Sequence, residues 1–293
     1  RDMFPEAVRA VREVRPKAFM FENVKGLLRE SFSKYFEYII LQLSYPEIRK
    51  KRDEDWQIHL ARLEKQHTSG KHGGLQYRVV FRLLNAADYG VPQKRERVFI
   101  VGIRNDVGLE WSFPERTHSE EALWWSKWET GEYWRIHNIS KKKSGGVPKF
   151  IADKLSSLSP PDKEPWMTVR DALRDLPDPR ITSSRRSYLN HIFQNGARIY
   201  HGHTGSPLDE PAKTLKAGDH GVPGGENMMV LPDRGVRYFT VRESARIQTF
   251  PDDYGFKVSW TESMRQIGNA VPVTLAHAVA KHLYTHMSKE SIA

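Results

Sequence analysis

A glutamate, Glu22, stands where an apolar run ends and a glycine-containing turn begins. The run is AFMFE at residues 18–22, and the letters NVKG follow it. Ligands of open α/β sheets gather outside the carboxyl ends of strands, so a carboxylate in this place can meet one. Apolar surroundings raise the pKa of a carboxyl group, which suits it to hold or share a proton near neutral pH. The alternative is a salt bridge between Glu22 and a lysine or arginine at the sheet edge.

Two arginines and an amide recur at alternate positions in VPQKRERVFIVG, residues 91–102. In a strand, alternate residues share a face, so Gln93, Arg95 and Arg97 are expected to point one way. Such an array of donors suits a carboxylate, a phosphate or the oxygen edge of a base. The alternative is a solvated edge strand whose charges discourage aggregation.

A third stretch, RQIGNAVP, places Gly268 and Asn269 in an expected tight turn before a helix. Backbone N–H groups and the asparagine amide could bind a small polar ligand there, although such a turn can also be only a helix start. His201 and His203 form a His-x-His pair, but neither cysteines nor an acidic cluster accompany it. We therefore expect no metal site.

Periodicity predicts the elements that position these residues. Apolar spacing and flanking prolines predict a helix before residue 16, a strand over AFMFE and a helix over 32–43. The charged stretch 46–67 is expected to be a solvated helical insertion with a thin apolar stripe. Residues 75–92 and 95–104 read as two strands joined by a Gly-Pro turn.

Beyond residue 105 the sequence changes character. Residues 105–235 are rich in Trp, Pro, Gly, Ser and His, and they predict a separate, loop-rich, β-containing region. Its tryptophans are expected to form a core or an interface. Thr240 and Glu243 then form a capping-box pattern at the start of a helix. A final amphipathic helix is expected to begin near Pro272.

Composition narrows the class of protein. The 293 residues carry a formal net charge of +10, which points to a polyanionic partner, with nucleic acid as the first candidate. No stretch approaches the length of a membrane span, and the N-terminus has no secretion signal, so we expect no membrane and a cytoplasmic location, nucleoid-associated in a prokaryote. The sequence contains no cysteine, which excludes disulfides and any thiol nucleophile among these residues.

The order of four stretches is more specific than any one of them. RPKAFMFENVKG, LNAADYGVPQKRERVFIVGIR, RYFTVRESARIQTFPDDY and QIGNAVPVTLA follow one another, with a variable region in the middle. This order closely resembles the DNA (cytosine-5) methyltransferases. The resemblance implies part of a Rossmann-like α/β domain that depends on S-adenosylmethionine, together with a smaller target-recognition domain that binds double-stranded DNA. The implied boundaries are 1–105 for the catalytic half, 106–262 for recognition and 263–293 for a returning helix.

The resemblance also implies catalytic roles. Glu22 matches the family glutamate that contacts N3 and the amino group of a flipped cytosine, and Asn23 matches the asparagine that orders the nucleophile loop. Arg95 and Arg97 match an Arg-x-Arg pair near the base, with Gln93 leading that motif.

Binding roles follow from other matches. Asn269 and Val271 match positions that line the S-adenosylmethionine site. Thr214, Arg237 and Tyr254 are the expected DNA contacts.

Two family elements are missing: the Phe-x-Gly-x-Gly cofactor loop and the Pro-Cys dipeptide that carries the nucleophile. We therefore expect residues 1–293 alone to be inactive, as an N-terminally truncated part of a single-chain enzyme. One alternative is a split enzyme, in which a complementing subunit supplies the cysteine. Others are an inert DNA-binding partner and a transfer-RNA cytosine-5 methyltransferase.

Overall fold

The computed structural model describes residues 3–69, 73–140, 145–181, 188–218, 227–232 and 235–290, without the side chains of 289 and 290. Contacts divide the chain into two compact units that are each discontinuous in sequence. Unit 1 comprises Arg1–Leu84, Glu96–Pro114 and Val279–Ala293, and unit 2 comprises Asn85–Arg95 and Glu115–Ala278.

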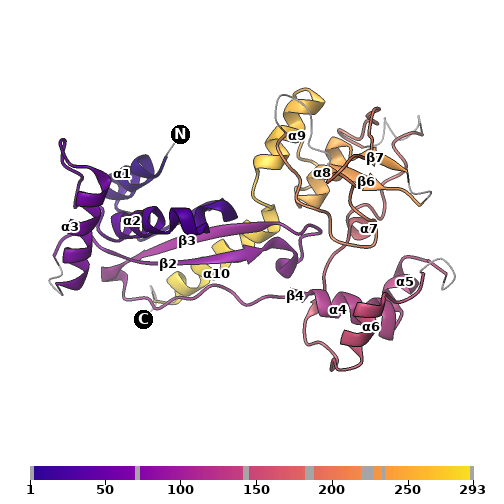
Figure 1. Ribbon diagram of the computed structural model, residues 1–293, viewed down its shortest axis with the longest axis horizontal. Coiled ribbons are helices and arrows are strands. Elements are labelled where there is room, and N and C mark those ends of the chain that lie inside the picture. The colour runs from indigo at the N-terminus through magenta and orange to yellow at the C-terminus, as the bar shows by residue number, and fades with distance from the viewer. Residues whose placement is uncertain are drawn as a thin grey trace. The chain divides into compact units, whose positions relative to one another are not determined.

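Unit 1 is built on a three-stranded sheet with the order β1-β3-β2 (Figure 1). Its elements, in chain order, are α1 (Phe4–Val14), β1 (Ala18–Val24), the 3₁₀ turns η1 (Lys25–Leu28) and η2 (Glu30–Phe32), α2 (Ser33–Ser44), α3 (Trp56–Thr68), β2 (Tyr77–Asn85), β3 (Glu96–Arg104) and η4 (Asn105–Val107). The C-terminal part of α10 (Val273–Glu290) also belongs to this unit from Val279 onward. The helices and strands predicted for residues 4–104 are thus confirmed in type.

Strand β1 runs antiparallel to β3, in a register that pairs Phe19 with Gly102 and Val24 with Arg97. The ring of Phe19 covers Gly102: a Cβ atom built on that glycine would lie 2.2 Å from Phe19 Cζ. Phe19 is itself buried and packs against Phe21 and Tyr77. The absent side chain of Gly102 therefore makes room for the aromatic cluster on the next strand.

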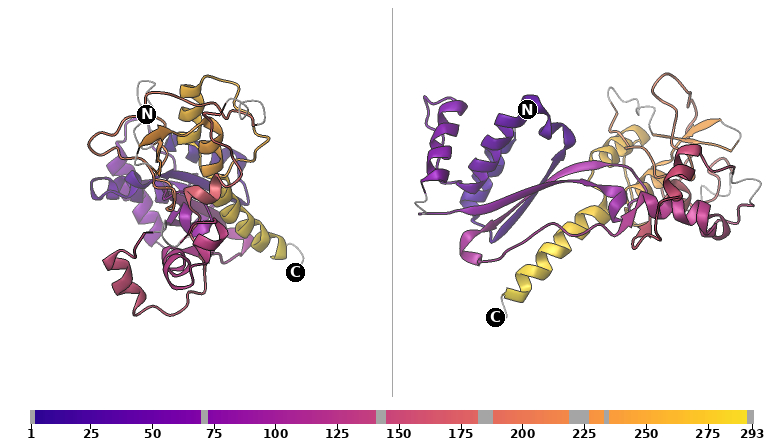
Figure 2. Two further views of the ribbon diagram at one scale, coloured as in Figure 1. Left: turned by 90° about the vertical axis from the view of Figure 1, so that its right-hand side faces the viewer. Right: turned by 60° about the horizontal axis from the view of Figure 1, so that its bottom comes forward.

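Helices α1 and α2 pack on one face of this sheet, and the part of α10 from Val279 onward lies on the other (Figure 2). The core of the first face combines residues from both helices and all three strands. It consists of Val8, Val11, Phe19, Phe36, Ile39, Leu43, Tyr77, Val98 and Ile100. Val8 and Val11 are the buried residues of α1, so the apolar spacing of the N-terminal sequence marks the side of the helix that packs in this core.

Helix α3 is attached to α2 by a second, smaller cluster that includes Leu60 and Leu63. A buried histidine completes the attachment. His59 is 1% exposed, and its Nε2–H donates to the carbonyl of Ile48 while the Tyr38 hydroxyl donates to its Nδ1, both at 2.8 Å. The helix predicted for the charged insertion 46–67 is confirmed only from Trp56 onward, and its thin apolar stripe is what fixes it to α2.

Unit 2 contains many short elements. They are η3 (Ala86–Tyr89), β4 (His118–Ser119), α4 (Glu120–Trp124), the π-helical turn η5 (Trp125–Glu129), α5 (Glu132–Ile136), α6 (Lys149–Leu155), β5 (Glu164–Pro165), α7 (Val169–Ala172), β6 (Met228–Val230), β7 (Val236–Tyr238), α8 (Val241–Ile247), α9 (Trp260–Asn269) and the start of α10. Strands β4 and β5 pair in parallel, and β6 and β7 pair antiparallel. The loop-rich, β-containing region predicted from the sequence is confirmed.

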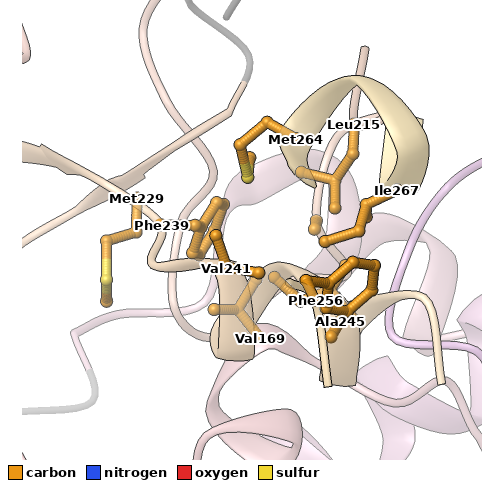
Figure 3. Close-up of a cluster of buried hydrophobic side chains, with 11 residues drawn as sticks. Val169, Leu215, Met229, Phe239, Val241, Ala245, Phe256, Met264 and Ile267 are labelled. Atoms are coloured by element: carbon orange, nitrogen blue, oxygen red, sulfur yellow. The ribbon is translucent and has the colours of Figure 1, made fainter. Parts of the chain in front are cut away.

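The main core of unit 2 gathers residues from α7, α8, α9 and the strands beside them (Figure 3). Phe239, Ala245 and Ile267 are fully buried at its centre. Helix α8 begins with the predicted capping box, in which Thr240 and Glu243 each accept a hydrogen bond from the other's backbone N–H. The tryptophans around Trp124 form separate small clusters inside the unit, as expected.

Membrane-spanning helices and metal sites can both be sought among the described residues. Among the described residues, no helix is both long and apolar enough to cross a membrane. Within the same ranges, no three histidine, cysteine or acidic side chains gather in the way that a metal site would require.

Candidate functional site

The carboxylate of Glu22 is held by Arg97, with 2.7 Å between Arg97 Nε and Glu22 Oε1. The register explains this pair. Val24 lies opposite Arg97, so Glu22, two residues before Val24, shares a face with Arg97 as its diagonal neighbour. Both side chains are half-buried, with 23% of Glu22 and 12% of Arg97 exposed. The salt bridge expected as the alternative role of Glu22 is therefore present.

Burial lowers the pKa of the Arg97 guanidinium, while the charge and the hydrogen bond of Glu22 act in the opposite direction. Arg97 also donates from Nη1 to the carbonyl of Glu96. The two side chains thus form a charged pair that is partly withdrawn from water yet still reaches the surface. A pair in this setting can present both an oxygen and N–H groups to a planar polar ligand.

Glu22 lies within β1 rather than at its end, because the strand continues to Val24. Its neighbour Asn23 points to the opposite face by strand alternation. The Asn23 side-chain oxygen accepts a hydrogen bond from the backbone N–H of Val24 at 2.8 Å. Asn23 is half-buried, and its predicted role toward a nucleophile loop stays a prediction.

Gln93 and Arg95 belong to unit 2, whereas Glu22 and Arg97 belong to unit 1, and the single strand expected to carry Gln93, Arg95 and Arg97 is not formed. Strand β3 begins only at Glu96, so strand alternation does not apply to the residues before it. Both side chains are completely buried within unit 2. Arg95 donates to the carbonyls of Leu215, Gly268 and Ala270 at 2.7–2.9 Å. Its contacts are with the protein's own backbone.

The stretch around Gly268 and Asn269 also differs from its prediction as a turn that starts a helix. Both residues are the last two of α9, and α10 begins four residues later at Val273. The N–H of Val273 donates to the carbonyl of Gln248, and the N–H of Thr274 donates to Thr249 Oγ1. These two donors at the start of α10 are therefore occupied. Of the two expected cofactor contacts, Asn269 has an exposed side chain and Val271 a half-buried one.

The three expected DNA contacts have different surroundings. Arg237 is only 7% exposed and forms a buried pair with Glu243, at 2.6 and 2.7 Å. This burial does not support the expected phosphate contact, because both Nη atoms of the guanidinium already donate to the carboxylate of Glu243. Thr214 is half-buried, and its hydroxyl donates to the carbonyl of Lys94. Tyr254 is 50% exposed, which leaves its ring available.

A buried residue that the sequence analysis did not single out is Gln248, which directly follows α8. It is fully buried at the end of α8, where its Nε2 donates to the carbonyls of Ile267 and Ala270. Its Oε1 accepts a hydrogen bond from Gln93 Nε2 at 3.2 Å. The available signal was a polar residue at the position where the apolar spacing of Val241 and Ala245 continues, because a buried polar group requires a hydrogen-bond partner.

Comparison with known proteins gives the family. The family model for C-5 cytosine-specific DNA methylases matches residues 1–45 and 62–285. Among curated relatives, the type II methyltransferase M.BspRI of Lysinibacillus sphaericus is 32% identical over 94% of this chain and 53% of its own. The type II methyltransferase M.NgoFVII of Neisseria gonorrhoeae is 32% identical over 92% of this chain and 59% of its own.

The solved structures support the fold. A prophage-encoded protein of E. coli, described as a DNA modification methyltransferase, has a TM-score of 0.52 and 20% identity. The match covers 97% of this chain and 73% of that one. The predicted Rossmann-like α/β methyltransferase fold is therefore confirmed. The chain spans between half and three-fifths of the length of the two curated relatives. Because the family model matches most of its residues, the chain belongs to the C-5 cytosine-specific DNA methylase family.

Proposed function

We propose that the protein to which these residues belong is a DNA (cytosine-5) methyltransferase. It transfers a methyl group from S-adenosylmethionine to C5 of a cytosine in a short, specific site of duplex DNA. The observation that carries the proposal is the half-buried Glu22–Arg97 pair inside a chain that matches the family over residues 1–45 and 62–285. The curated relatives are named type II methyltransferases, which favours a specific short site.

The pair suits the chemistry of cytosine. C5 of the base is a poor nucleophile until another nucleophile adds to C6. When a thiolate forms a bond to C6, the C5–C6 π electrons shift into the ring, and a proton delivered to N3 leaves a neutral, enamine-like ring with a nucleophilic C5. Glu22 would hold that proton, and Arg97 would fix the carboxyl group and donate to the base. The thiolate comes from outside residues 1–293, which contain no cysteine.

S-adenosylmethionine supplies an electrophilic methyl group when bound. Its expected contacts in this chain are Asn269 and Val271. The exposed amide of Asn269 can pair with a polar group of the cofactor, and the half-buried Val271 can contact an apolar one. The neighbouring carbonyls of Gly268 and Ala270 accept from Arg95, so the backbone on which both residues sit is firmly held.

Duplex DNA is the proposed substrate. A target cytosine must leave the base stack before Glu22 can reach its N3, at a cost of a few kcal/mol that the pocket must offset. The net charge of +10 favours association with the phosphate backbone. Of the three residues expected at DNA, Tyr254 has the exposed surface that such a contact needs.

The test is product analysis with the complete polypeptide. Purified protein is incubated with methyl-labelled S-adenosylmethionine and plasmid DNA from a methylation-free host, and the digested nucleosides are separated. We expect the label in 5-methylcytosine at one short sequence. Label in unfractionated transfer RNA, but not in DNA, would favour the RNA enzyme. DNA binding with no transfer to either substrate would favour an inert partner or a split enzyme. Only the split enzyme would gain activity when a complementing subunit is added.

A further inference from the structure

A buried polar network in unit 2 connects four segments of the chain, namely residues 93–95, 212–217, 248 and 267–270. Its members are the side chains of Gln93, Arg95 and Gln248, none of which has measurable exposure to solvent. Buried polar groups are costly unless they are hydrogen-bonded, and a fully bonded network holds its parts in one arrangement. The network therefore fixes whatever backbone it contacts.

One side of the network holds the junction between α9 and α10. The last carbonyls of a helix have no partner within the helix, so they must be satisfied from elsewhere. Gln248 Nε2 donates to Ile267 O at 2.7 Å and to Ala270 O at 3.2 Å. Arg95 Nη2 donates to Gly268 O at 2.7 Å and to Ala270 O at 2.9 Å. Asn269, an expected cofactor contact, lies between the held carbonyls.

The other side holds the segment 212–217. Gln93 Oε1 accepts from the N–H of Leu215 at 3.0 Å, and Arg95 Nη1 donates to its carbonyl at 2.8 Å. The segment also lies directly on the end of α9, since a Cβ atom on Gly268 would be 2.3 Å from Ala217 N. Thr214, an expected DNA contact, belongs to this segment.

Arg95 holds carbonyls on both sides, and the bond from Gln93 Nε2 to Gln248 Oε1 joins the two sides a second time. The amide of Gln248 thus accepts from the side that holds residues 212–217 and donates to the side that holds the α9–α10 junction. A methionine of similar length would fill the same space but could make neither contact. Gln248 is consequently the place where one of the two links can be removed with the least change of volume, while Arg95 keeps the other.

We propose that Gln248 is a positioning residue that couples binding of the cofactor at the α9–α10 junction to binding of DNA at residues 212–217. The inference rests on the proposed function. Each ligand then meets a site whose backbone the other has already stabilised, so each raises the affinity for the other by the same factor. The residue contacts neither ligand itself and acts through the held carbonyls.

The experiment measures this factor in the complete enzyme. The Kd of S-adenosylhomocysteine is determined by calorimetry without DNA and with saturating plasmid DNA from a methylation-free host. For the wild type we expect DNA to tighten binding about tenfold, within the usual range of such couplings. For Gln248→Met we expect the ratio of the two Kd values to fall well below the wild-type value, because only the Arg95 link remains. Gln266→Met, on the exposed side of α9, is the matched control and should keep the wild-type ratio.

A second variant keeps the coupling testable if the Gln248→Met protein does not fold. Gln93→Met breaks the same link from the other side and should also lower the ratio. A wild-type ratio of one, or an unchanged ratio in a folded Gln248→Met or Gln93→Met protein, would overturn the coupling. Failure of the proposed function would look different: the wild-type enzyme would transfer no methyl group to DNA, whatever the ratio.

Discussion

At the scale of the residue, Glu22 is the group whose removal is most informative. Glu22→Gln in the complete enzyme keeps the size of the side chain but cannot transfer a proton. If Glu22 delivers the proton to N3, kcat should fall by roughly 10²–10⁴-fold, while the affinity for DNA changes little. Glu30→Gln, at an exposed position of the same unit, should leave both quantities unchanged. Normal turnover of Glu22→Gln would remove this carboxylate from the mechanism.

The salt bridge of Glu22, expected as the alternative to its catalytic role, could be predicted from the type of residue and its place in an apolar run. A carboxylate that interrupts an apolar strand must find a partner, and the β1–β3 register supplies Arg97. Arg237 shows the opposite case. Its partner Glu243 is six residues away across a turn and a capping box, and nothing in the intervening sequence specifies that the two side chains meet. The sequence does not distinguish an arginine that binds an internal carboxylate from one that binds phosphate.

At the scale of the element, the contact of Phe19 with Gly102 makes a prediction about β1 and β3. Gly102→Ala places a methyl group where the buried ring of Phe19 lies. Overpacking of this kind costs about 1–3 kcal/mol, so the urea midpoint of the chain should fall. Gly26→Ala is the control, because the atoms nearest to its Cβ are at an ordinary 3.5 Å. If the ring swings aside without cost, the two variants will unfold at the same urea concentration.

The attachment of α3 to α2 predicts a pH dependence. Burial lowers the pKa of His59, so the folded chain resists the proton that the unfolded chain accepts near pH 6.5. Stability should therefore be full above about pH 6.5 and decline as the pH falls below it. Urea unfolding at about pH 8 and pH 5.5 measures the difference. His59→Gln should be less stable at the higher pH but lose less on acidification. An equal loss in both proteins would exclude His59 as the cause.

Elements were predictable where their signals are periodic, and junctions were not. The spacing of Val8 and Val11 and the capping box at Thr240 are local signals, and the structure has both helices. The alternation of Gln93, Arg95 and Arg97 looked like one strand, but Gln93 instead forms an isolated bridge with Ala212, more than a hundred residues later. The pairing of Gln93 with Ala212 thus lies outside β3, which begins at Glu96, and the spacing of side chains does not reveal this boundary.

At the scale of the whole molecule, the charge of +10 predicts how the complete protein binds DNA. Displacement of counterions by lysine and arginine makes affinity fall as salt rises. If about six to ten phosphates are contacted, the slope of log K against log salt should be roughly −5 to −9. Fluorescence anisotropy with a labelled duplex at several salt concentrations gives this slope. A slope near zero would mean that the basic residues do not face the phosphates.

The last prediction concerns residues 1–293 taken alone. Two compact units, with cores of their own, give this polypeptide a basis for folding and for contacting DNA. With no cysteine, however, it has no thiolate to add to C6, and Glu22 has no developing charge to neutralise. We expect the isolated chain to transfer no methyl group from labelled S-adenosylmethionine, while the complete polypeptide does. Transfer by the cysteine-free chain would show that the nucleophile is not a thiolate, and the role given to Glu22 would then require a different first step.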